Sequence, residues 1–181
     1  LRQIAVLPTG AGKSLCWMLP AVLVEGLTIA VFPLLSLMSD QERRLTECGI
    51  KSVVLRGGQA KSERKKSWNM LKLGEAKIVL ANPEVLQSPE VESRLEKLHP
   101  TFLVVDETHT VSQWGESFRP ACAEMGRLVK SWEPPAVLAL TATAGPHMRE
   151  RIKELLFNGE TPTEALADPD RPAIRYGVYP S

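Results

Sequence analysis

Residues 7–14 have the composition of a loop that binds phosphate. They read LPTGAGKS and lie between an apolar run at 4–7 and a helix-length segment at 13–24. The usual pattern has Gly where Leu7 stands, but two glycines still allow a tight turn whose backbone N–H groups face one anion. The following helix points the positive end of its dipole at the same place. We therefore predict nucleotide binding, rather than an ordinary helix-capping turn, by Thr9, Gly10, Ala11, Gly12, Lys13 and Ser14.

Two carboxylates, Asp106 and Glu107, follow the apolar run at 102–105. At the carboxyl end of a buried parallel strand they would lie beside the phosphate loop. Burying such charges costs several kcal/mol unless a cation compensates them. A Mg²⁺ ion held through Ser14 and Asp106 would supply that cation, and Glu107 would then act as general base on a water molecule. The alternative for Asp106 alone is a helix N-cap. The predicted catalytic residues are Lys13, Asp106 and Glu107.

Two further groups of residues have side chains suited to chemistry or contact. Thr141 and Thr143 end an apolar run, where their hydroxyls either connect the carboxylates to another site or simply cap the strand end. Trp114 and Phe118 lie in a polar, glycine-containing segment in which core burial is not obvious. Rings on a loop stack on unpaired bases for ~1–3 kcal/mol, and Arg119 adds a phosphate contact. The alternative is that both rings fasten the loop to the sheet.

The elements that must position these residues alternate between strands and helices. Short apolar runs predict strands at 4–7, 27–32, 52–55, 78–81, 102–106 and 137–141, and longer amphipathic stretches predict helices at 13–24, 36–48, 61–73, 91–98, 121–130 and 147–156. Continuous apolar runs are typical of parallel strands covered on both faces. The fold class is therefore α/β, a doubly wound and mainly parallel sheet flanked by helices.

Composition excludes several classes of protein. The 181 residues include 22 basic and 21 acidic side chains, so no global charge attracts nucleic acid, and no apolar run reaches the ~20 residues of a membrane span. The cysteines, Cys16, Cys48 and Cys122, match no metal spacing and indicate a reducing compartment. We interpret Cys16 as a small buried residue, Trp17, Trp68 and Trp132 as packing residues, and the basic stretch 51–77 as a solvated helix face.

Taken in order, these segments resemble the motifs of superfamily 2 helicases, and in particular those of RecQ-type DNA helicases. Residues 7–14 resemble motif I, 32–41 motif Ia, 81–84 a motif Ib-like segment, 106–109 motif II and 139–144 motif III. The most specific segment, SQWGESFRP at 112–120, resembles the aromatic-rich loop of RecQ enzymes. Residues 170–176 resemble the passage into the family's second motor domain.

The resemblance implies an ATP-dependent 3′–5′ DNA helicase that uses ATP and Mg²⁺ and acts on single-stranded or forked DNA. Residues 1–157 would form the first RecA-like, P-loop motor domain, truncated at its N-terminus because a strand begins almost at Leu1. Residues 158–181 would be a linker into a second RecA-like domain. The implied coupling residues are His109, Gln113, Thr141 and Thr143, and the implied DNA contacts are Ser36, Asn82, Trp114, Phe118 and Arg119.

The sequence also departs from the family pattern. Thr108 stands where the family usually has Ala, and Thr110 where it has Cys; Glu116 and Ser117 replace the common His and Asp, and Gly145 a common Asp. None of these changes removes a phosphate-contacting group, so we expect nucleotide chemistry to be intact. The changes at 116 and 117 lie in the DNA-sensing loop and affect the expected strength of coupling.

Other functions remain open at this point. One is an RNA helicase or another superfamily 2 translocase, against which the 112–120 loop argues. A nucleotide switch or nucleoside kinase would need an acceptor pocket and lid arginines that are not identifiable, and a non-hydrolysing module would not need Lys13, Ser14, Asp106 and Glu107 together. Without the second domain we expect weak ATP hydrolysis or none. The expected location is cytoplasmic, with the nucleoid, in a bacterium and nuclear in a eukaryote, with no membrane partner.

Overall fold

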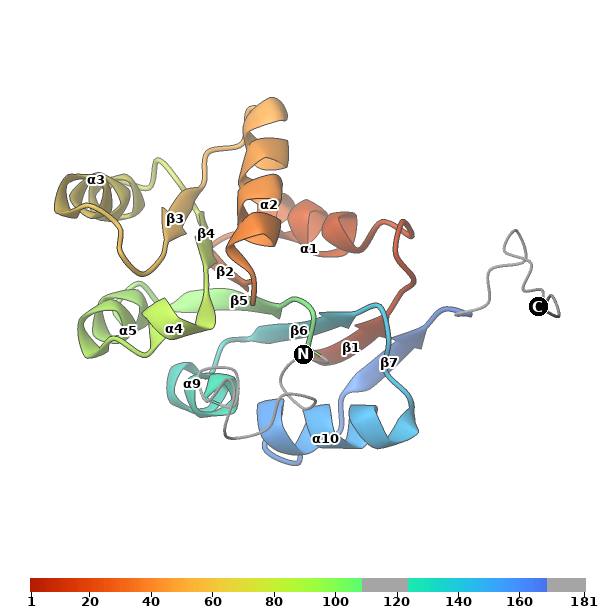
Figure 1. Ribbon diagram of the computed structural model, residues 1–181. Coiled ribbons are helices and arrows are strands. Elements are labelled where there is room, and N and C mark those ends of the chain that lie inside the picture. The colour runs from red at the N-terminus through yellow and green to blue at the C-terminus, as the bar shows by residue number, and fades with distance from the viewer. Residues whose placement is uncertain (109–123, 169–181) are drawn as a thin grey trace, which may run out of the picture.

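The computed structural model describes residues 1–108 and 124–168. Its strands form one seven-stranded sheet in the order β3-β4-β2-β5-β6-β1-β7 (Figure 1). The strands are β1 (Arg2–Val6), β2 (Leu27–Val31), β3 (Val53–Leu55), β4 (Ile78–Ala81), β5 (Pro100–Val105), β6 (Ala136–Thr141) and β7 (Thr163–Leu166). All six pairings between neighbours are parallel, which confirms the predicted fold class.

Helices connect the strands and cover both faces of the sheet. They are α1 (Lys13–Leu23), α2 (Leu35–Glu47), α3 (Lys61–Lys72), α4 (Pro83–Leu86), α5 (Pro89–Glu96), α9 (Met125–Trp132) and α10 (Pro146–Leu156). Figure 1 shows α1 and α2 on one side of the sheet and α9 and α10 on the other. Six of the seven strands and six of these helices were predicted from the sequence, with boundaries shifted by one to four residues at most ends. The short helix α4 was not.

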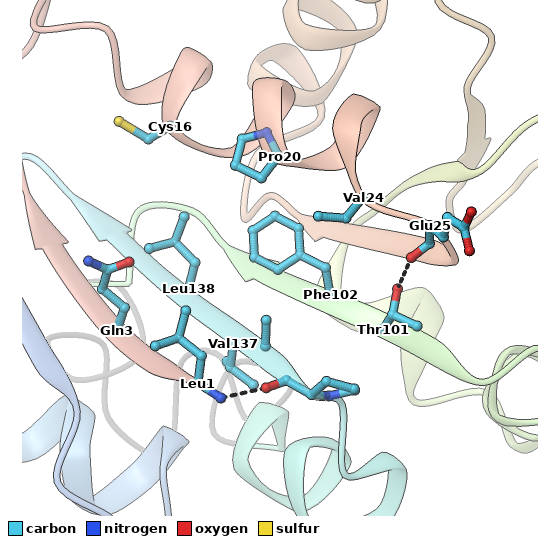
Figure 2. A pocket seen from close by; sticks show the side chains of 12 residues that line it. Leu1, Gln3, Cys16, Pro20, Val24, Glu25, Thr101, Phe102, Val137 and Leu138 are labelled. Carbon is cyan, nitrogen blue, oxygen red and sulfur yellow. Dashed lines mark hydrogen bonds between the residues drawn. The ribbon is translucent and has the colours of Figure 1, made fainter.

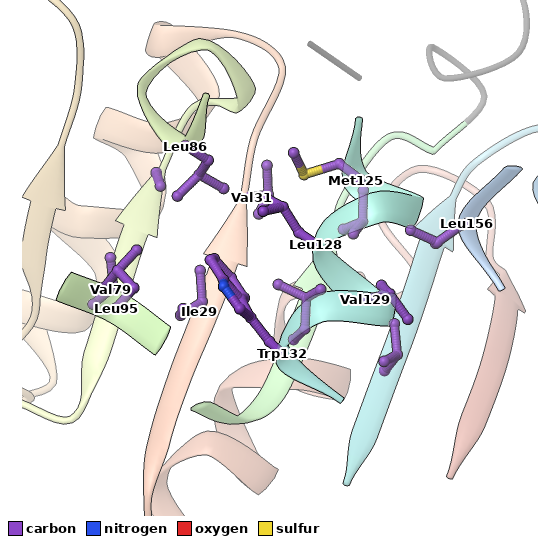
Figure 3. Packing of buried hydrophobic residues seen from close by; sticks show 14 of the residues in the cluster. Ile29, Val31, Val79, Leu86, Leu95, Met125, Leu128, Val129, Trp132 and Leu156 are labelled. Carbon is purple, nitrogen blue, oxygen red and sulfur yellow. The ribbon is translucent and has the colours of Figure 1, made fainter. Parts of the chain in front are cut away.

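Alternate strand residues face two different hydrophobic cores. Ile29 and Val31 of β2 lie in the cluster that includes α9 and α10, whereas Ala30 belongs to the cluster beneath α1 and α2. Figure 3 shows Ile29 and Val31 pointing toward side chains of α9, among them Trp132. Because both faces of the strands are buried, no polar residue is needed in the run, and each buried aliphatic side chain contributes about 1.5–3 kcal/mol.

The tryptophans that were interpreted as packing residues do pack in the interior. Trp17 is fully buried and meets Phe32 edge to face, with ring centroids 6.0 Å apart. Trp132 is 8% exposed, and the partly buried Trp68 packs against the same core. That interpretation is confirmed for all three residues.

Helix α9 is held in place by a close crossing and an ion pair. A Cβ on Gly126 would collide with the backbone carbonyl of Leu155, so α9 and α10 approach at a distance that only glycine permits. On the other side, Arg127 makes a bidentate pair with Glu92 of α5, at 2.7 and 2.8 Å, which lowers the pKa of the Glu92 carboxyl. Both contacts fix the helix that follows residue 123.

The stretch after residue 157 differs from its predicted character. Residues 163–166 form β7, which pairs with β1 in the register Gln3↔Thr163 to Val6↔Leu166, so the linker predicted for the whole of 158–181 is wrong at this point. The reason is that TEAL begins with two polar residues and lies mostly exposed at a sheet edge, so it lacks the continuous apolar run by which the others were found. In the described residues, no helix is long and apolar enough to cross a membrane.

Candidate nucleotide-binding site

The phosphate loop rises from the carboxyl end of β1 and turns into α1. The backbone N–H of Leu7 bonds to the Thr141 carbonyl of β6 at 3.0 Å, and the N–H of Ala11 bonds to the Pro8 carbonyl at 3.1 Å. Gly10 and Gly12 have φ of +88° and +85°, in the left-handed region that favours glycine. A Cβ at either position would meet nothing within 4 Å, so the loop borders open space rather than packed side chains.

Helix α1 begins directly at Lys13, with Gly12 as its N-cap residue. None of the described side chains caps this end, and its first turn carries no acidic residue. The first N–H groups of a helix have no partner within the helix and carry its positive dipole end. The loop therefore presents donors and a positive potential to the same open space, which suits an anion such as a phosphate group.

The acid pair lies where β5 leaves the sheet. The backbone N–H of Asp106 still bonds to Val31 of β2, at 3.0 Å, so Asp106 continues the strand. Glu107 then turns the chain with a φ of +50°, and its N–H bonds to the Asp106 carboxylate at 2.9 Å. Thr108 is fully buried and donates both its N–H and its hydroxyl to the Leu140 carbonyl of β6, at 2.9 and 3.1 Å.

The phosphate loop and the acid pair converge. The Lys13 amino group lies 3.6 Å from a Glu107 carboxylate oxygen, and these side chains are 14% and 21% exposed. The prediction that residues 13 and 106–107 share one edge of the sheet is therefore confirmed. Only β6 stands between the strands that carry them, because the local order is β5-β6-β1. Their individual catalytic roles remain predictions.

Asp106 carries a charge that its surroundings do not fully balance. Burial, and then the neighbouring Glu107 charge, raise the pKa of the Asp106 carboxyl to about 6, although the Glu107 N–H and Lys13 act to lower it. A cation at this point would compensate the buried carboxylate. The predicted donor set, the Asp106 carboxylate and the hydroxyl of Ser14, the residue after Lys13, consists of hard oxygens and suits Mg²⁺, which takes one or two protein ligands and completes its shell with water and phosphate. The residues present thus fit the predicted ion.

The metal site predicted from sequence involves no larger cluster. Within residues 1–108 and 124–168, no group of three or more His, Cys, Asp and Glu side chains could hold a metal ion by itself. Cys16 and Cys48 are free thiols at exposed positions. The interpretation of Cys16 as a buried residue is therefore wrong: it lies on the side of α1 that faces a hollow, and its Sγ contacts the Gly12 carbonyl at 3.7 Å.

The coupling residues that the structure describes form a local turn. The Thr141 hydroxyl accepts the N–H of Thr143 at 3.2 Å and donates to its carbonyl at 3.1 Å, which is the strand-end capping considered as the alternative. Since Thr141 also holds Leu7 through its carbonyl, the turn is attached to the phosphate loop. A coupling role for Thr141 and Thr143 stays a prediction. His109 and Gln113 lie outside the described residues.

Of the five residues predicted to contact DNA, two lie in the part of the chain that the structure describes. Ser36 is exposed in the first turn of α2, which follows β2. Asn82 is 8% exposed, precedes α4, and donates its side-chain amide to Glu84, so a strand would have to be held there through the backbone. Trp114, Phe118 and Arg119 lie outside the described residues. Their roles, and those of Ser36 and Asn82, stay predictions.

Thr108 and Leu140 are structural members of the site that sequence reasoning missed. The buried Thr108 hydroxyl attaches the turn after Glu107 to the end of β6. The available signal was the hydroxyl-bearing residue directly after the acid pair, at a position noted only as a departure. Leu140 acts through its carbonyl oxygen, and no side-chain pattern can indicate such a role.

An apolar hollow of about 480 Å³ lies away from this site (Figure 2). Its walls are Cys16 and Pro20 of α1, Val24 directly after that helix and, beneath them, Gln3, Phe102 and Leu138 of the sheet. The hollow extends to the amino ends of the strands, at Leu1 and Thr101, whereas the phosphate loop and the acid pair lie at the carboxyl ends. It is therefore separate from the phosphate-binding space.

An all-parallel doubly wound sheet, with a glycine-rich loop after its first strand and a carboxylate pair two strands away, defines a phosphate-loop nucleotide-binding domain. The family model of the DEAD/DEAH box helicases matches residues 2–152. The chain belongs to this family. The helicase resemblance noted in the motifs is confirmed at that level.

The relatives are helicases that are much longer than this chain. It is 36% identical over 174 residues to the ATP-dependent DNA helicase RecQ of Pasteurella multocida, covering 96% of this chain and 27% of the relative. It is 39% identical over 153 residues to the probable ATP-dependent DNA helicase RecS of Bacillus subtilis, covering 84% and 31%. The chain thus spans about a third or less of the relatives' length.

The fold is also found in a solved helicase structure. The DUF1998 helicase MrfA, bound to DNA, superposes with a TM-score of 0.72 at 23% identity, covering 93% of this chain and 25% of that one. At this identity the likeness shows the fold alone.

Proposed function

We propose that this chain is the ATP-binding motor domain of a RecQ-type, ATP-dependent DNA helicase acting in DNA repair or recombination. The observation that carries the proposal is the 3.6 Å pair between Lys13 and Glu107, which brings a phosphate-binding lysine and a candidate general base to one open space. The RecQ relatives support the choice of activity, since they are DNA helicases by name.

Lys13 and the loop N–H groups bind the phosphates of ATP. The loop leaves open space around Gly10 and Gly12, and the amino end of α1 adds its positive potential. Lys13 then exchanges part of its pairing with Glu107 for the terminal phosphates. A Mg²⁺ ion held by Ser14 and Asp106 would neutralise charge on those phosphates.

Glu107 activates the attacking water. Its carboxylate accepts a proton as the water oxygen bonds to the γ-phosphorus and the bond from that phosphorus to the β–γ bridging oxygen breaks. The left-handed backbone at Glu107 directs the carboxylate back toward Lys13, and the buried Thr108 attaches the turn to β6. Asp106 stays next to β2 through its N–H, so the two carboxylates have separate tasks.

Movement along DNA requires more than this chain in our proposal. Ser36, Asn82 and the 112–120 segment would contact single-stranded or forked DNA through sequence-neutral groups. A second RecA-like domain would supply an arginine to the transition state, a contribution of ~10³ or more in rate, so the chain alone hydrolyses ATP weakly. We propose 3′–5′ movement by likeness to RecQ enzymes, residues 1–157 together with β7 as the first motor domain, and activity in the nucleoid or nucleus.

The decisive experiment measures ATP binding with Mg²⁺ by the wild-type chain and two lysine variants. Lys13→Ala should lose affinity by about 100-fold, because a charge-assisted contact to phosphate is removed. Lys97→Ala, an exposed lysine after α5, is the matched control and should bind as wild type. Equal ATP affinity in the three proteins would overturn the proposal.

The finer parts of the proposal have their own measurements. Hydrolysis stimulated by DNA but not by RNA, in a protein that also contains the second motor domain, would support the DNA substrate. Unwinding of a duplex with a 3′ single-stranded extension, but not of one with a 5′ extension, would support the direction. Stimulation by RNA alone would instead favour an RNA helicase.

A further inference from the structure

The basic stretch 51–77 divides into residues with internal partners and residues without them. Lys77 donates to the carbonyls of Val22 and Val24 at the end of α1, and Lys51 pairs with Glu75 at 3.8 Å. Arg64 donates to the Arg56 carbonyl at 2.6 Å. These cations stabilise the fold, so they do not belong to an interaction surface. The lysines of α3 are different.

Three of the α3 lysines form a stripe along one side of the helix. Lys61, Lys65 and Lys72 are exposed and follow one another at i, i+4 and i+11, positions that fall within about 40° of one another around an α-helix. Within the described residues, none of the three makes an ion pair. The stripe runs about 16 Å along the helix.

An arginine that stacks on a tryptophan of α3 adds a fourth cation to the same side. Trp68 occupies i+7 of the stripe and packs inward against the core, and the Arg94 guanidinium of α5 lies over its ring, 5.3 Å from the centroid. Arg94 is half exposed and reaches back to Glu90 at 3.1 Å. Lys66 is excluded from the stripe, because it lies on another side of α3 and lines a polar hollow with Glu42 and Glu63.

The position of Lys61 conflicts with helix electrostatics. It is the first residue of α3, where the positive end of the helix dipole disfavours a cation. Glu63 in the same turn offsets part of this unfavourable interaction, but Lys61 itself still opposes the dipole, and such a local conflict is typical of a residue that serves binding rather than stability. The stripe therefore starts with a lysine whose charge the helix itself does not need.

The sheet order leads from the nucleotide site to this stripe. From β5, the neighbouring strands are β2, β4 and then β3, at the end of the sheet opposite β7 (Figure 1). At their carboxyl ends lie the start of α2 with Ser36, then Asn82, and then Arg56, to which Arg64 ties the first turn of α3. A DNA strand bound at Ser36 and Asn82 would therefore reach Lys61 next.

We propose that Lys61, Lys65 and Lys72 form a second, sequence-neutral contact surface for the phosphate backbone of a nucleic-acid strand. It extends the binding track sideways from the carboxyl edge of the sheet along α3. This inference rests on the proposed function for its substrate, and it replaces the interpretation of α3 as a merely solvated face. Near-neutral overall charge does not oppose it, since phosphate binding depends on local cations.

The test measures binding of two single strands, of about 6 and about 30 nucleotides, to the 181-residue chain over a range of salt concentrations. We expect the combined variant Lys61→Ala, Lys65→Ala, Lys72→Ala to bind the long strand at least tenfold more weakly at low salt. Its salt slope should fall by about 2, from about 0.7 for each lost phosphate contact. The variant should bind the short oligonucleotide with wild-type affinity, because that oligonucleotide fits at the carboxyl ends of the β-strands and does not reach α3.

Lys66→Ala is the matched control, with the same charge change on another side of the same helix, and should leave both affinities unchanged. The Lys61→Ala single variant should weaken long-strand binding while slightly raising the unfolding midpoint, two effects that a structural role would not combine. Wild-type affinity in the combined variant, or an equal loss for both strands, would overturn the stripe. Failure of wild type to bind either strand would count against the DNA part of the proposed function, and ATP binding separates that result from loss of the nucleotide site.

Discussion

The amino group of Lys13 and the carboxylate of Glu107 lie 3.6 Å apart, although 94 positions separate them in the chain. One belongs to the first turn of α1, the other to the turn after β5. Before ATP binds, the positive charge of Lys13 and the negative charge of Glu107 largely compensate each other. ATP binding therefore requires a rearrangement of this pair. Substitution of Lys13 is predicted to weaken ATP binding, whereas substitution of Glu107 is predicted to slow hydrolysis.

Removing the Glu107 charge should separate hydrolysis from binding. In the Glu107→Gln variant, Lys13 loses a competing partner, so ATP affinity should stay level or rise. Hydrolysis by a protein that includes the second motor domain should fall by about 10²–10⁴, as expected for loss of a general base. Glu150→Gln, which removes an exposed carboxylate of α10, should change neither quantity. A Glu107→Gln protein that hydrolyses ATP at the normal rate would exclude Glu107 as the base.

The Asp106 charge should make the ligand-free protein less stable at neutral pH. Its pKa is about 6 in the folded chain and 3.8 in the unfolded one, so the folded state binds more protons between these values. Preferential proton binding by the folded Asp106 carboxyl stabilises the chain. This contribution to the free energy of unfolding is complete below pH 3.8 and is lost as the pH rises through 6. Asp106→Asn should therefore raise the free energy of unfolding by about 3 kcal/mol relative to wild type at pH 7.5.

Urea unfolding at several pH values, with EDTA and without nucleotide, measures that difference. It should shrink between pH 6 and pH 4. Asp40→Asn provides a control of opposite sign, because the hydrogen bond from Arg43 is the main cause that lowers the pKa of the Asp40 carboxyl. Wild type should be the more stable protein there above pH 4, with the advantage lost as the pH falls further. A pH-independent effect of Asp106→Asn would contradict the origin given for the raised pKa.

Gly126→Ala should destabilise the chain in spite of alanine's better helix propensity. The added Cβ collides with the Leu155 carbonyl, so α9 and α10 must separate, at a cost of about 2 kcal/mol or more against the ~1 kcal/mol that alanine gains. Thermal unfolding of the variant measures the balance. Gly145→Ala introduces the same atom into open space before α10 and should shift stability by less than about 1 kcal/mol. Equal midpoints for the two variants would show that the crossing is not tight.

The fold could be predicted from sequence because the buried strands have a strong local signature. Runs such as Ile29–Val31 of β2 are apolar at every position, and the two faces of the sheet require this. β7 escaped because it is a mostly exposed edge strand whose four residues include only two apolar ones, so that signal is missing. α4 escaped because its four residues are too few for a helical period to be recognised.

The site could be predicted only as far as side chains identify it. Lys13, Asp106 and Glu107 have residue types and positions that imply phosphate chemistry, and the sheet does bring two of them into contact. The supports behind them are mainly backbone groups. The Leu140 and Thr141 carbonyls hold Thr108 and Leu7, and a carbonyl is the same in every residue. The raised pKa of Asp106 also depends on burial, which sequence spacing does not measure.

β6 acts as a spacer. With this single strand between β1 and β5, two strand-to-strand intervals, about 10 Å in all, separate the roots of the phosphate loop and the acid turn. Because consecutive carbonyls of that strand hold both roots, the width of the gap is set by the pitch of the sheet rather than by flexible side chains. The spacing of the β-strands therefore determines the length of the ligand that can contact the phosphate loop and the acid turn at the same time.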